Sequence, residues 1–440
     1  MKPNLKMYST VFCMILLSFL NACKKTDAPV TLIPKANVPE IISTDQSGIS
    51  LAVPKSAKIF DVGTGSGDLV IDGKSMNIED NILVRIKGGT YNNLSIRNIK
   101  APKGMTVFVK NNGKVKISES MTTNNISNVI IAGDNTTGLE YGFVFENLPY
   151  RAISMSGRIN GITLMYMSFK NIPNNVIGGD NSNGYGFPHK STEESRNQNF
   201  KILKCVFDNT GQISFGGTLN KDTGEDSGLF KTVEIAHNTF KNSNAGNLCY
   251  FSNVQDYNIH HNVVENVNKT NNEHNGIFFM QGNGSFHHNK LTNYQGNAIR
   301  MWLFSRGNAP AVNEIYNNIC FNTRKYGAFE LQAFDRNIYS GKSTFANAKI
   351  YNNTVGHMNT SQDWEGQILD LYNTKGSLEY YNNLGFELKS RSSITNMINN
   401  MSDTKITKIQ SNVYKGKQAD AVMDAQKFTS KINGIGAAPF

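Results

Sequence analysis

Three charged residues occupy the same position in three short phrases of the C-terminal half of the chain. Arg300, Glu330 and Asp370 each stand between two apolar residues, so a β-strand would turn the apolar neighbours inward and the charged residue outward. Parallel strands stack about 4.8 Å apart, and the three side chains would then form one outward column. Such a column offers an arginine and two carboxylates, which are groups that can do acid–base chemistry.

Aromatic residues fall in the next outward column of the same predicted strands. The alignment places Phe251, Trp302 and Tyr372 on the outer face and turns Tyr250 and Phe279 toward the core. Charged groups lined by aromatic faces are what a sugar chain meets in a binding groove. We therefore expect a carbohydrate groove along this face.

Long turns leave these strands, and long loops on a rigid scaffold are where function usually lies. We expect such turns at 180–200, 216–232, 303–313 and 333–347. They contribute further candidates for binding and catalysis, namely His189, Lys190, Glu225, Asp226, Arg306 and Arg336.

A β-elimination on a uronic acid is one chemistry that these residues could perform. Lys190 or Arg300 would act as the base that removes the proton beside the sugar carboxylate. The charge of that carboxylate would be neutralised by an arginine or by a calcium ion. Glu225 and Asp226 are the candidate calcium ligands, because calcium prefers carboxylate oxygens.

Hydrolysis by two carboxylates is the second chemistry. Glu330 and Asp370 on adjacent strands could lie at the short separation that retaining glycosidases use. Two readings involve no catalysis. The column could be a charge ladder that keeps the strand soluble, or the chain could be a glycan-binding or adhesive surface protein.

A repeated phrase supplies the elements that would position these residues. It reads Ile235-Ala-His-Asn238-Thr-Phe240-Lys-Asn242 and returns with starts at Ile259, Phe286, Ile315, Ile350 and Tyr380. A period of roughly 20 to 50 residues is the signature of a solenoid. Asn suits turns and can bond along a stack. Three short strands per unit predict an all-β fold, a single right-handed parallel β-helix, rather than a sandwich or propeller.

Histidines and cysteines also align with this repeat. His237, His261 and His288 share one position of three successive units, with His260 and His287 just before two of them. Three stacked imidazoles could hold zinc, but no carboxylate recurs beside them, which favours a stacked polar ladder. Two cysteines, Cys205 and Cys320, fall at inward or turn positions and are expected to be small core residues.

The N-terminus has the order of an export signal. Lys2 and Lys6 precede an apolar run that ends at Leu20-Asn-Ala-Cys23. This order resembles a bacterial lipoprotein signal, and the resemblance implies a lipid on Cys23 and a place in the bacterial cell envelope. We expect a signal peptide at 1–22, a tether at 23–47, a β-helix at 48–410 whose first part, 48–80, is a cap, and a second cap at 411–440.

The net charge of +10 over 440 residues favours an acidic partner. A uronic-acid glycan fits an exported protein, whereas no nucleic-acid motif is present, so we expect no nucleic acid and a monomer. The run that begins Ile82-Leu-Val-Arg-Ile86-Lys-Gly-Gly-Thr-Tyr91 resembles the first coils of pectate-lyase-like β-helices, including the chondroitinase-B and alginate-lyase group. That resemblance implies a polysaccharide lyase, although the Arg-x-His-Gly run of the chondroitinase-B group is absent.

Overall fold

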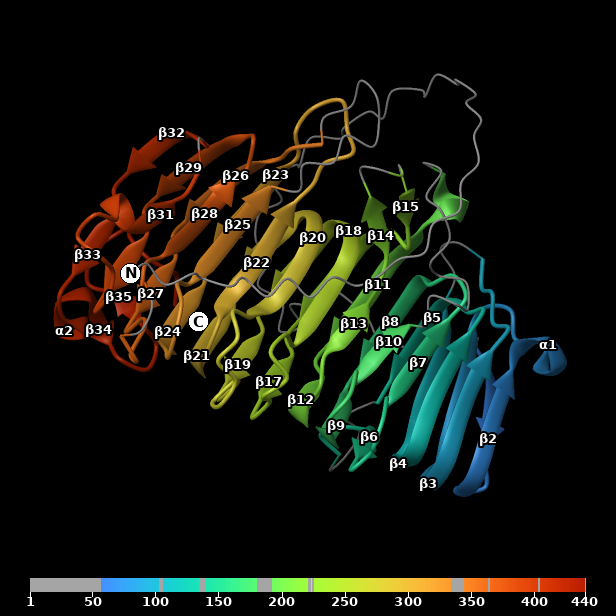
Figure 1. Ribbon diagram of the computed structural model, residues 1–440. Helices are drawn as coiled ribbons and strands as arrows, with labels where there is room; N and C mark the ends of the chain where they lie inside the picture. The colour runs from blue at the N-terminus through green and yellow to red at the C-terminus, as the bar shows by residue number, and fades with distance from the viewer. Residues whose placement is uncertain are drawn as a thin grey trace, which may run out of the picture. The chain divides into compact units, whose positions relative to one another are not determined.

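The computed structural model describes residues 57–102, 106–133, 139–179, 192–220, 223, 225–333, 344–362, 365–402 and 404–439. All of them belong to one compact unit, Ser43–Phe440. Within it, parallel strands stack coil upon coil (Figure 1), and their pairings form three ladders, which we call the first, second and third sheets. The predicted all-β parallel β-helix is therefore confirmed.

The first sheet holds the opening strand of each repeated phrase. Its strands are β1 (Lys58–Val62), the first parts of β3 (Ile82–Arg97) and β4 (Val107–Asn124), β5 (Ser127–Ala132), β8 (Asn160–Met165), β11 (Asn197–Leu203), β16 (Phe230–Ala236), the last parts of β18 (Cys249–His260) and β20 (Gly276–His287), β23 (Val312–Tyr316), β26 (Asn347–Tyr351), β29 (Ser377–Tyr381) and β32 (Lys405–Gln410).

The second sheet holds the closing half of the phrase. Its strands are the middle parts of β3 and β4, β6 (Phe143–Glu146), β9 (Met167–Ile172), β12 (Val206–Thr210), β17 (Thr239–Lys241), β19 (Val263–Glu265), β21 (Lys290–Tyr294), β24 (Ile319–Thr323), β27 (Thr354–Gly356), β30 (Leu384–Phe386) and β33 (Val413–Lys415). Stacked rings of Phe145, Phe169, Phe207 and Phe240 fill its inner side, at centroid distances of 5.0, 4.9 and 4.7 Å.

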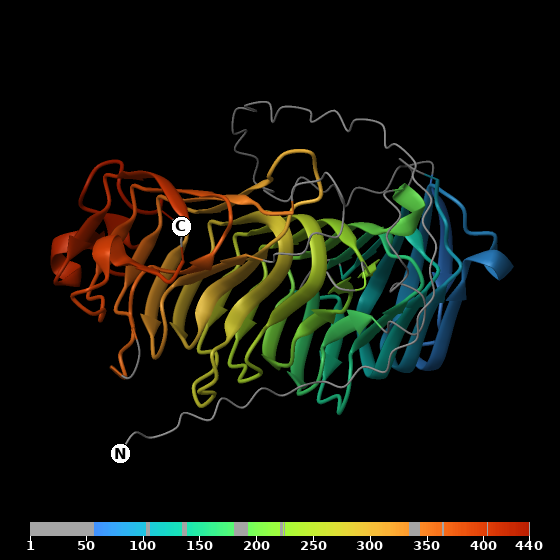
Figure 2. The same cartoon turned by 45° about the horizontal axis from the view of Figure 1, so that its top comes forward.

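The third sheet carries the charged column. Its strands are β2 (Ser66–Asp72), the last parts of β3 and β4, β7 (Ile153–Ser156), β10 (Ile177–Gly179), β13 (Ile213–Phe215), the first parts of β18 and β20, β22 (Asn297–Leu303), β25 (Phe329–Ala333), β28 (Leu369–Asn373) and β31 (Ile398–Asn400). Figure 2 shows these strands running along one side of the stack.

A buried asparagine ladder fixes the corner between the first and second sheets. Asn262 donates from its side chain to the carbonyl of Ile235, at 2.8 Å, and to Oδ1 of Asn289 in the next coil, at 2.9 Å. The pattern repeats from Asn238 to Asn412. The expected bonding of amides along the stack is confirmed. The left-handed residue at this corner is the one before the ladder asparagine, such as His261 with φ 52°.

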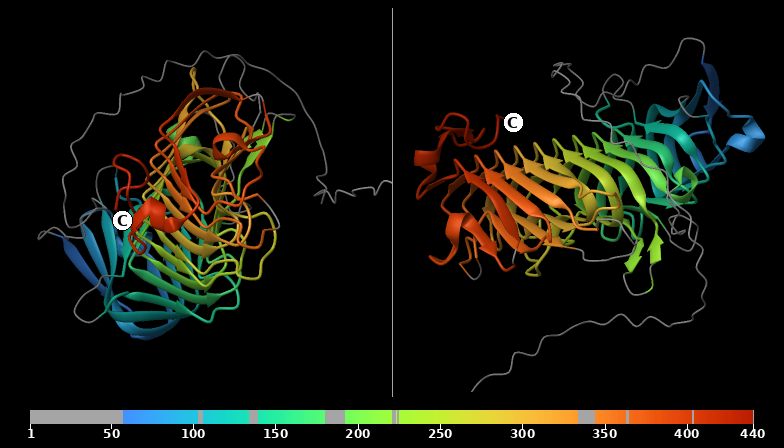
Figure 3. Two further views of the ribbon diagram at one scale, coloured as in Figure 1. Left: turned by 90° about the vertical axis from the view of Figure 1, so that its left-hand side faces the viewer. Right: turned by 90° about the horizontal axis from the view of Figure 1, so that it is seen from above.

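The described parts of the two predicted caps contain strands of the stack. Residues 57–80, the described part of the predicted 48–80 cap, include strands β1 and β2 of the first coil and helix α1 (Gly73–Met76). At the other end, helix α2 (Gln418–Ala421) and the hairpin β34 (Val422–Asp424) with β35 (Thr429–Ser430) pack on the outer side of the second sheet (Figure 3), because Phe428 and Val422 contact Phe386 and Ile319 there.

The remaining elements are short. An antiparallel hairpin of β14 (Thr218–Asn220) and β15 (Glu225–Ser227) leaves the third sheet, and two 3-10 turns cover Glu193–Ser195 and Thr395–Met397. Among the described residues, none of the helices has the length and apolar character needed to cross a bilayer. Cys205, Cys249 and Cys320 are all buried free thiols, which confirms the core role expected for Cys205 and Cys320.

Candidate active site

The three charged residues form one column, as the sequence predicts. Arg300 of β22 is paired in register with Glu330 of β25, and Glu330 is paired with Asp370 of β28. The same column holds Phe279 one coil earlier and Asn399 one coil later. It is not a solvated charge ladder, however, because Glu330 is 0% exposed and Asp370 is 2% exposed.

Two side chains, Arg300 and His274, converge on the buried Glu330 carboxylate. Arg300 Nε donates to Glu330 Oε1 at 2.8 Å, and His274 Nε2 lies 3.1 Å from Glu330 Oε2. His274 Nε2 also contacts Oδ1 of Asn297 at 2.9 Å. Arg300 Nη1 donates to the backbone carbonyl of His274 at 3.1 Å, so the arginine holds the histidine segment in place. The side chains of Arg300 and His274 are 20% and 27% exposed.

Asp370 lies in an environment of amides. Its Oδ1 accepts from Asn399 Nδ2 at 3.2 Å and from Gln367 Nε2, and its Oδ2 lies 3.4 Å from Asn297 Nδ2. Burial raises the pKa of Asp370 to about 6, the amide of Asn399 opposes this rise, and the neighbouring charge of Glu330 adds to it. A carboxyl with this pKa changes protonation between mildly acidic and neutral pH.

Aromatic rings frame the pair of exposed groups. Tyr326 stacks on the His274 ring with centroids 4.2 Å apart, and the Arg300 guanidinium lies 5.4 Å from the Phe279 centroid. Trp302 meets Phe279 edge to face at 5.3 Å. Burial, with the charges of Glu330 and Asp370, raises the pKa of Tyr372 to about 12, which places that ring beside the carboxylates.

Two glycines make room for the column. A Cβ on Gly276 would lie 2.6 Å from Cγ of Arg300, and a Cβ on Gly327 would lie 3.1 Å from Oδ2 of Asp370. Side chains of one coil therefore lie across the glycine backbone of another. The glycines that open the half-units have a packing role at the site in addition to a role in turning the chain.

The predicted orientation of Phe251 is wrong. Phe251 is 0% exposed and pairs in register with the core residue Phe215 and with Met280, whereas Tyr250 and Phe279 stack 5.2 Å apart in the outward column. The strand begins at Cys249, and the sequence alignment was displaced by one residue here. A displacement of one residue sends every side chain to the opposite face.

The acidic residues proposed as calcium ligands do not form one site. Glu225 and Asp226 are consecutive in β15, so their side chains point to opposite faces, and Glu225 is exposed while Asp226 is buried. Arg306, the expected substrate-binding residue, instead forms a buried pair with Asp226, at 3.2 Å, and also contacts Asn253. A calcium ion shared by Glu225 and Asp226 therefore does not fit this arrangement.

Several predicted residues lie outside the described part of the chain. These are Cys23, His189, Lys190 and Arg336. The sequence analysis missed His274, Tyr326 and Asn297. His274 and Tyr326 lie in turns that no repeated phrase marks, and only the Asn297 position, at the start of a half-unit, carried a signal.

Three hollows among the described residues lie away from this column. The largest, about 590 Å³, is lined by residues of the C-terminal segment such as Lys417 and Met423. One of about 430 Å³ is lined by Tyr166, Lys204, His237 and Thr239 among others, and one of about 310 Å³ by Lys170, Asp208 and Lys241 among others. The linings of these three hollows do not include Arg300, Glu330 or Asp370.

No family model matches the chain, and no curated protein matches it. A solved structure of the PL6 family polysaccharide lyase Pedsa3628 from Pseudopedobacter saltans is similar to it at a TM-score of 0.44 and 13% sequence identity. The similarity covers 86% of this chain and 98% of that one.

Proposed function

We propose that this chain acts on an acidic polysaccharide and cleaves it by β-elimination, with Arg300 and His274 as the groups that touch the sugar. The observation that carries the proposal is that both side chains are partly exposed on the outer face and share one fully buried carboxylate, Glu330. A buried carboxylate that contacts both groups fixes the positions of their side chains.

The contacts of His274 indicate how it would act. Its Nε2 faces an amide oxygen of Asn297 and a carboxylate oxygen of Glu330, which are both acceptors. A neutral imidazole there carries its hydrogen on Nε2 and keeps the lone pair on Nδ1. Nδ1 is therefore the candidate general base, oriented by Glu330 as a carboxylate orients histidine in other acid–base sites.

Arg300 would bind the carboxylate of the uronic acid. Its Nε and Nη1 donate to Glu330 and to the backbone of His274, while Nη2 makes no hydrogen bond to another described residue. A guanidinium beside the sugar carboxylate stabilises the negative charge that develops when the neighbouring C–H proton leaves. The base takes that proton, a carbon–carbon double bond forms, the glycosidic C–O bond breaks, and the imidazolium returns the proton to the leaving oxygen.

The hydrolytic alternative is less well supported. Glu330 and Asp370 are in adjacent coils, as that mechanism needs, but at 0% and 2% exposure neither reaches the outer face. A nucleophile or acid must lie within hydrogen-bond reach of the substrate. We therefore assign Glu330 and Asp370 positioning roles.

We also propose that the chain is held in the bacterial cell envelope by a lipid on Cys23. The charged, apolar and small-residue order before Cys23 supports this. Radiolabelled fatty acid should enter the wild-type protein and should not enter a Cys23→Ser variant. Equal labelling of the two would exclude this anchor.

The activity test follows the ultraviolet absorbance of unsaturated uronate. The full-length protein would be incubated with alginate, pectate, chondroitin and dermatan sulfate, with and without a chelator. We expect a rise on one polymer, reduced about 100-fold or more in His274→Gln, because general base catalysis contributes roughly that much. Lys349→Arg, in the first sheet, is the matched control and should keep full activity. Binding of a polymer without any rise in absorbance would replace the lyase with a glycan-binding protein.

A further inference from the structure

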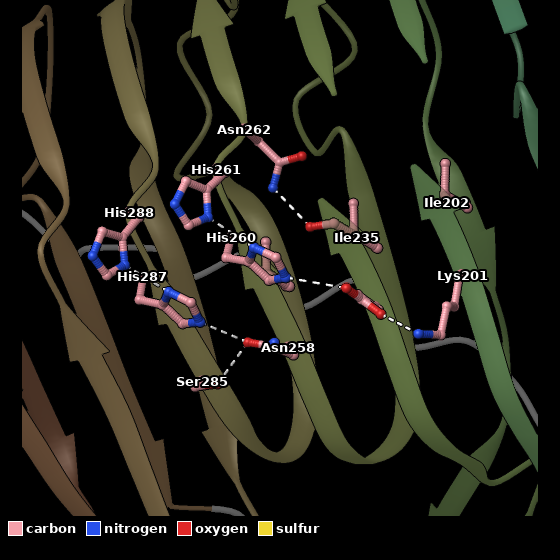
Figure 4. Close-up of polar contacts among 12 residues, drawn as sticks. Lys201, Ile202, Ile235, Asn258, His260, His261, Asn262, Ser285, His287 and His288 are labelled. Atoms are coloured by element: carbon pink, nitrogen blue, oxygen red, sulfur yellow. Dashed lines mark hydrogen bonds and ion pairs between the residues drawn. The ribbon is translucent and has the colours of Figure 1, made fainter. Parts of the chain in front are cut away.

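Paired histidines line the corner between the first and second sheets, far around the coil from the Arg300 column. Strand β18 ends at His260, which His261 follows, and strand β20 of the next coil ends at His287, which His288 follows. Figure 4 shows the two pairs side by side on neighbouring coils. The rings of His260 and His287 stack at 5.0 Å, and those of His261 and His288 at 4.9 Å.

The ring nitrogens within each pair lie close to the separation of two ligands on one metal ion. Nδ1 of His260 lies 2.9 Å from Nδ1 of His261, and the corresponding distance between His287 and His288 is 2.8 Å. Each contact is a hydrogen bond in which one ring donates to the other. Two imidazole nitrogens bound at about 2.0–2.1 Å to one tetrahedral ion lie about 3.3–3.4 Å apart, so a shift of about 0.5 Å would let a metal ion replace the shared hydrogen.

The other ring nitrogen of His260 has the partner that a metal-bound histidine needs. Nε2 of His260 contacts Oε1 of Glu234 at 3.2 Å, and Nζ of Lys201 holds the other oxygen of that carboxylate at 2.6 Å (Figure 4). A carboxylate acceptor keeps the hydrogen of the neutral ring on Nε2, which leaves Nδ1 unprotonated. Metal-binding histidines almost always donate their second N–H to such an acceptor.

A third imidazole and access from solvent complete the arrangement. One ligand nitrogen of each of His237, His260 and His261 lies within 4.8 Å of the others, and the His237 ring stacks on His261 at 5.0 Å. His237 and His261 are half-buried.

We propose that His237, His260 and His261 bind one divalent transition-metal ion of the kind that prefers imidazole ligands, such as Zn²⁺, Ni²⁺ or Cu²⁺. Imidazole nitrogen suits these ions, whereas calcium and magnesium prefer oxygen. When the ion binds Nδ1 of His261, the hydrogen of that ring moves to Nε2, so binding releases no net proton. This site does not depend on the proposed lyase activity, because it lies in a different corner of the coil and shares no residue with it.

Later coils of the same chain supply a natural control. Where the earlier coils have His260-His261 and His287-His288, the next coil has Tyr316-Asn317, with the Tyr316 ring stacked on His287 at 4.6 Å. Asn317 has the same left-handed backbone as His261, with φ 53° against 52°. A His260→Tyr, His261→Asn variant therefore adopts a sequence that this corner already accommodates.

The test is a calorimetric titration of the chelator-treated, full-length protein with Ni²⁺ and Zn²⁺, supported by the electron paramagnetic resonance spectrum of added Cu²⁺. We expect saturable binding, with nitrogen hyperfine structure from imidazole in the copper spectrum. The His260→Tyr, His261→Asn variant should lose at least about 10-fold in affinity, the range for loss of a metal-site residue. His357→Asn is the matched control, because His357 lies at another corner and pairs with Glu387 at 3.0 Å.

Each outcome of the metal titration either supports or overturns the proposed site. Binding that is weakened in the double variant and kept in His357→Asn supports the site. No binding by the wild-type protein overturns it, and so does equal affinity in the wild-type protein and the double variant. Circular dichroism of the double variant, expected to match the wild type, shows that lost affinity does not come from unfolding.

Discussion

Two cation–glutamate pairs, Arg300–Glu330 and Lys349–Glu379, join neighbouring coils in the same register but in different sheets. Lys349 and Glu379 lie 3.6 Å apart in the first sheet, with side chains 37% and 34% exposed. Arg300 and Glu330 lie 2.8 Å apart in the third sheet, where the glutamate is 0% exposed. The sequence pattern is the same, and only the surroundings differ.

The difference comes from what lies over each glutamate. His274 contacts Glu330 from a turn and carries the stacked ring of Tyr326, so the carboxylate is shielded from water. An exposed pair such as Lys349–Glu379 contributes roughly 0–1 kcal/mol to stability. A buried carboxylate must keep its partners, since removing one partner of a buried pair costs about 3–5 kcal/mol. Burial of the carboxylate therefore distinguishes the Arg300 pair from the exposed Lys349 pair.

The largest expected effect is on stability when each glutamate is removed. Glu330→Ala leaves Arg300 and His274 without their shared carboxylate, and we expect the free energy of unfolding to fall by about 3–5 kcal/mol. Glu379→Ala should change it by less than about 1 kcal/mol. Urea unfolding followed by circular dichroism measures both. Equal losses in the two variants would mean that burial does not distinguish the pairs.

The second prediction concerns pH and Asp370. Burial raises the pKa of Asp370 to about 6 in the folded protein, against an ordinary value of 3.8 for an aspartate. Between about pH 4 and pH 6 the Asp370 carboxyl therefore keeps its proton in the folded state and has lost it in the unfolded state. This contribution to stability is fully present below about pH 4 and is lost as the pH rises through about 6, with a size on the order of 3 kcal/mol.

An Asp370→Asn variant tests whether Asp370 causes this dependence of the unfolding free energy on pH. Since Asn has no titrating group, the fall in unfolding free energy between about pH 4 and pH 6 should flatten relative to the wild type. The exposed Glu379→Gln variant should keep the wild-type slope. A slope that is unchanged in Asp370→Asn would assign the titration to another group.

The smallest expected effect is that of exchanging the two cations. Arg300→Lys keeps the charge but loses the separate donor that reaches the His274 carbonyl, which we expect to cost about 1–2 kcal/mol. Lys349→Arg should be neutral within about 0.5 kcal/mol, as is usual for surface substitutions. Thermal unfolding of the two variants beside the wild type compares them. A neutral Arg300→Lys would mean that the link to His274 adds nothing to stability.

The repeated phrase was enough to predict the coil, because the apolar, Asn and Gly positions recur together and each has a physical role. The same spacing predicted the register of Arg300, Glu330 and Asp370. It failed at Phe251, where Leu248-Cys-Tyr-Phe251 is apolar throughout and alternation gives no phase. Which side chains of this strand face inward is decided by the pairing of Phe251 with Phe215, which is a contact between coils.

Burial and distant partners could not be predicted in the same way. Glu330 looks like a surface residue in its strand, and its cover comes from His274 and Tyr326 in turns that do not repeat. Arg306 and Asp226 pair across 80 residues of sequence, so each appeared to be a separate functional candidate. Such contacts depend on how irregular loops fold over the regular scaffold, and periodicity carries no information about them.

The most direct test of the central claim is a crystal structure of the His274→Gln protein bound to an oligouronate of the polymer that the wild-type protein cleaves. We expect the carboxylate of one sugar within hydrogen-bond distance of the Arg300 guanidinium, with its ring against Phe279 or Trp302. A sugar bound elsewhere, such as the hollow lined by Tyr166 and Lys204, with Arg300 untouched, would contradict the assignment of the Arg300 column as the active site.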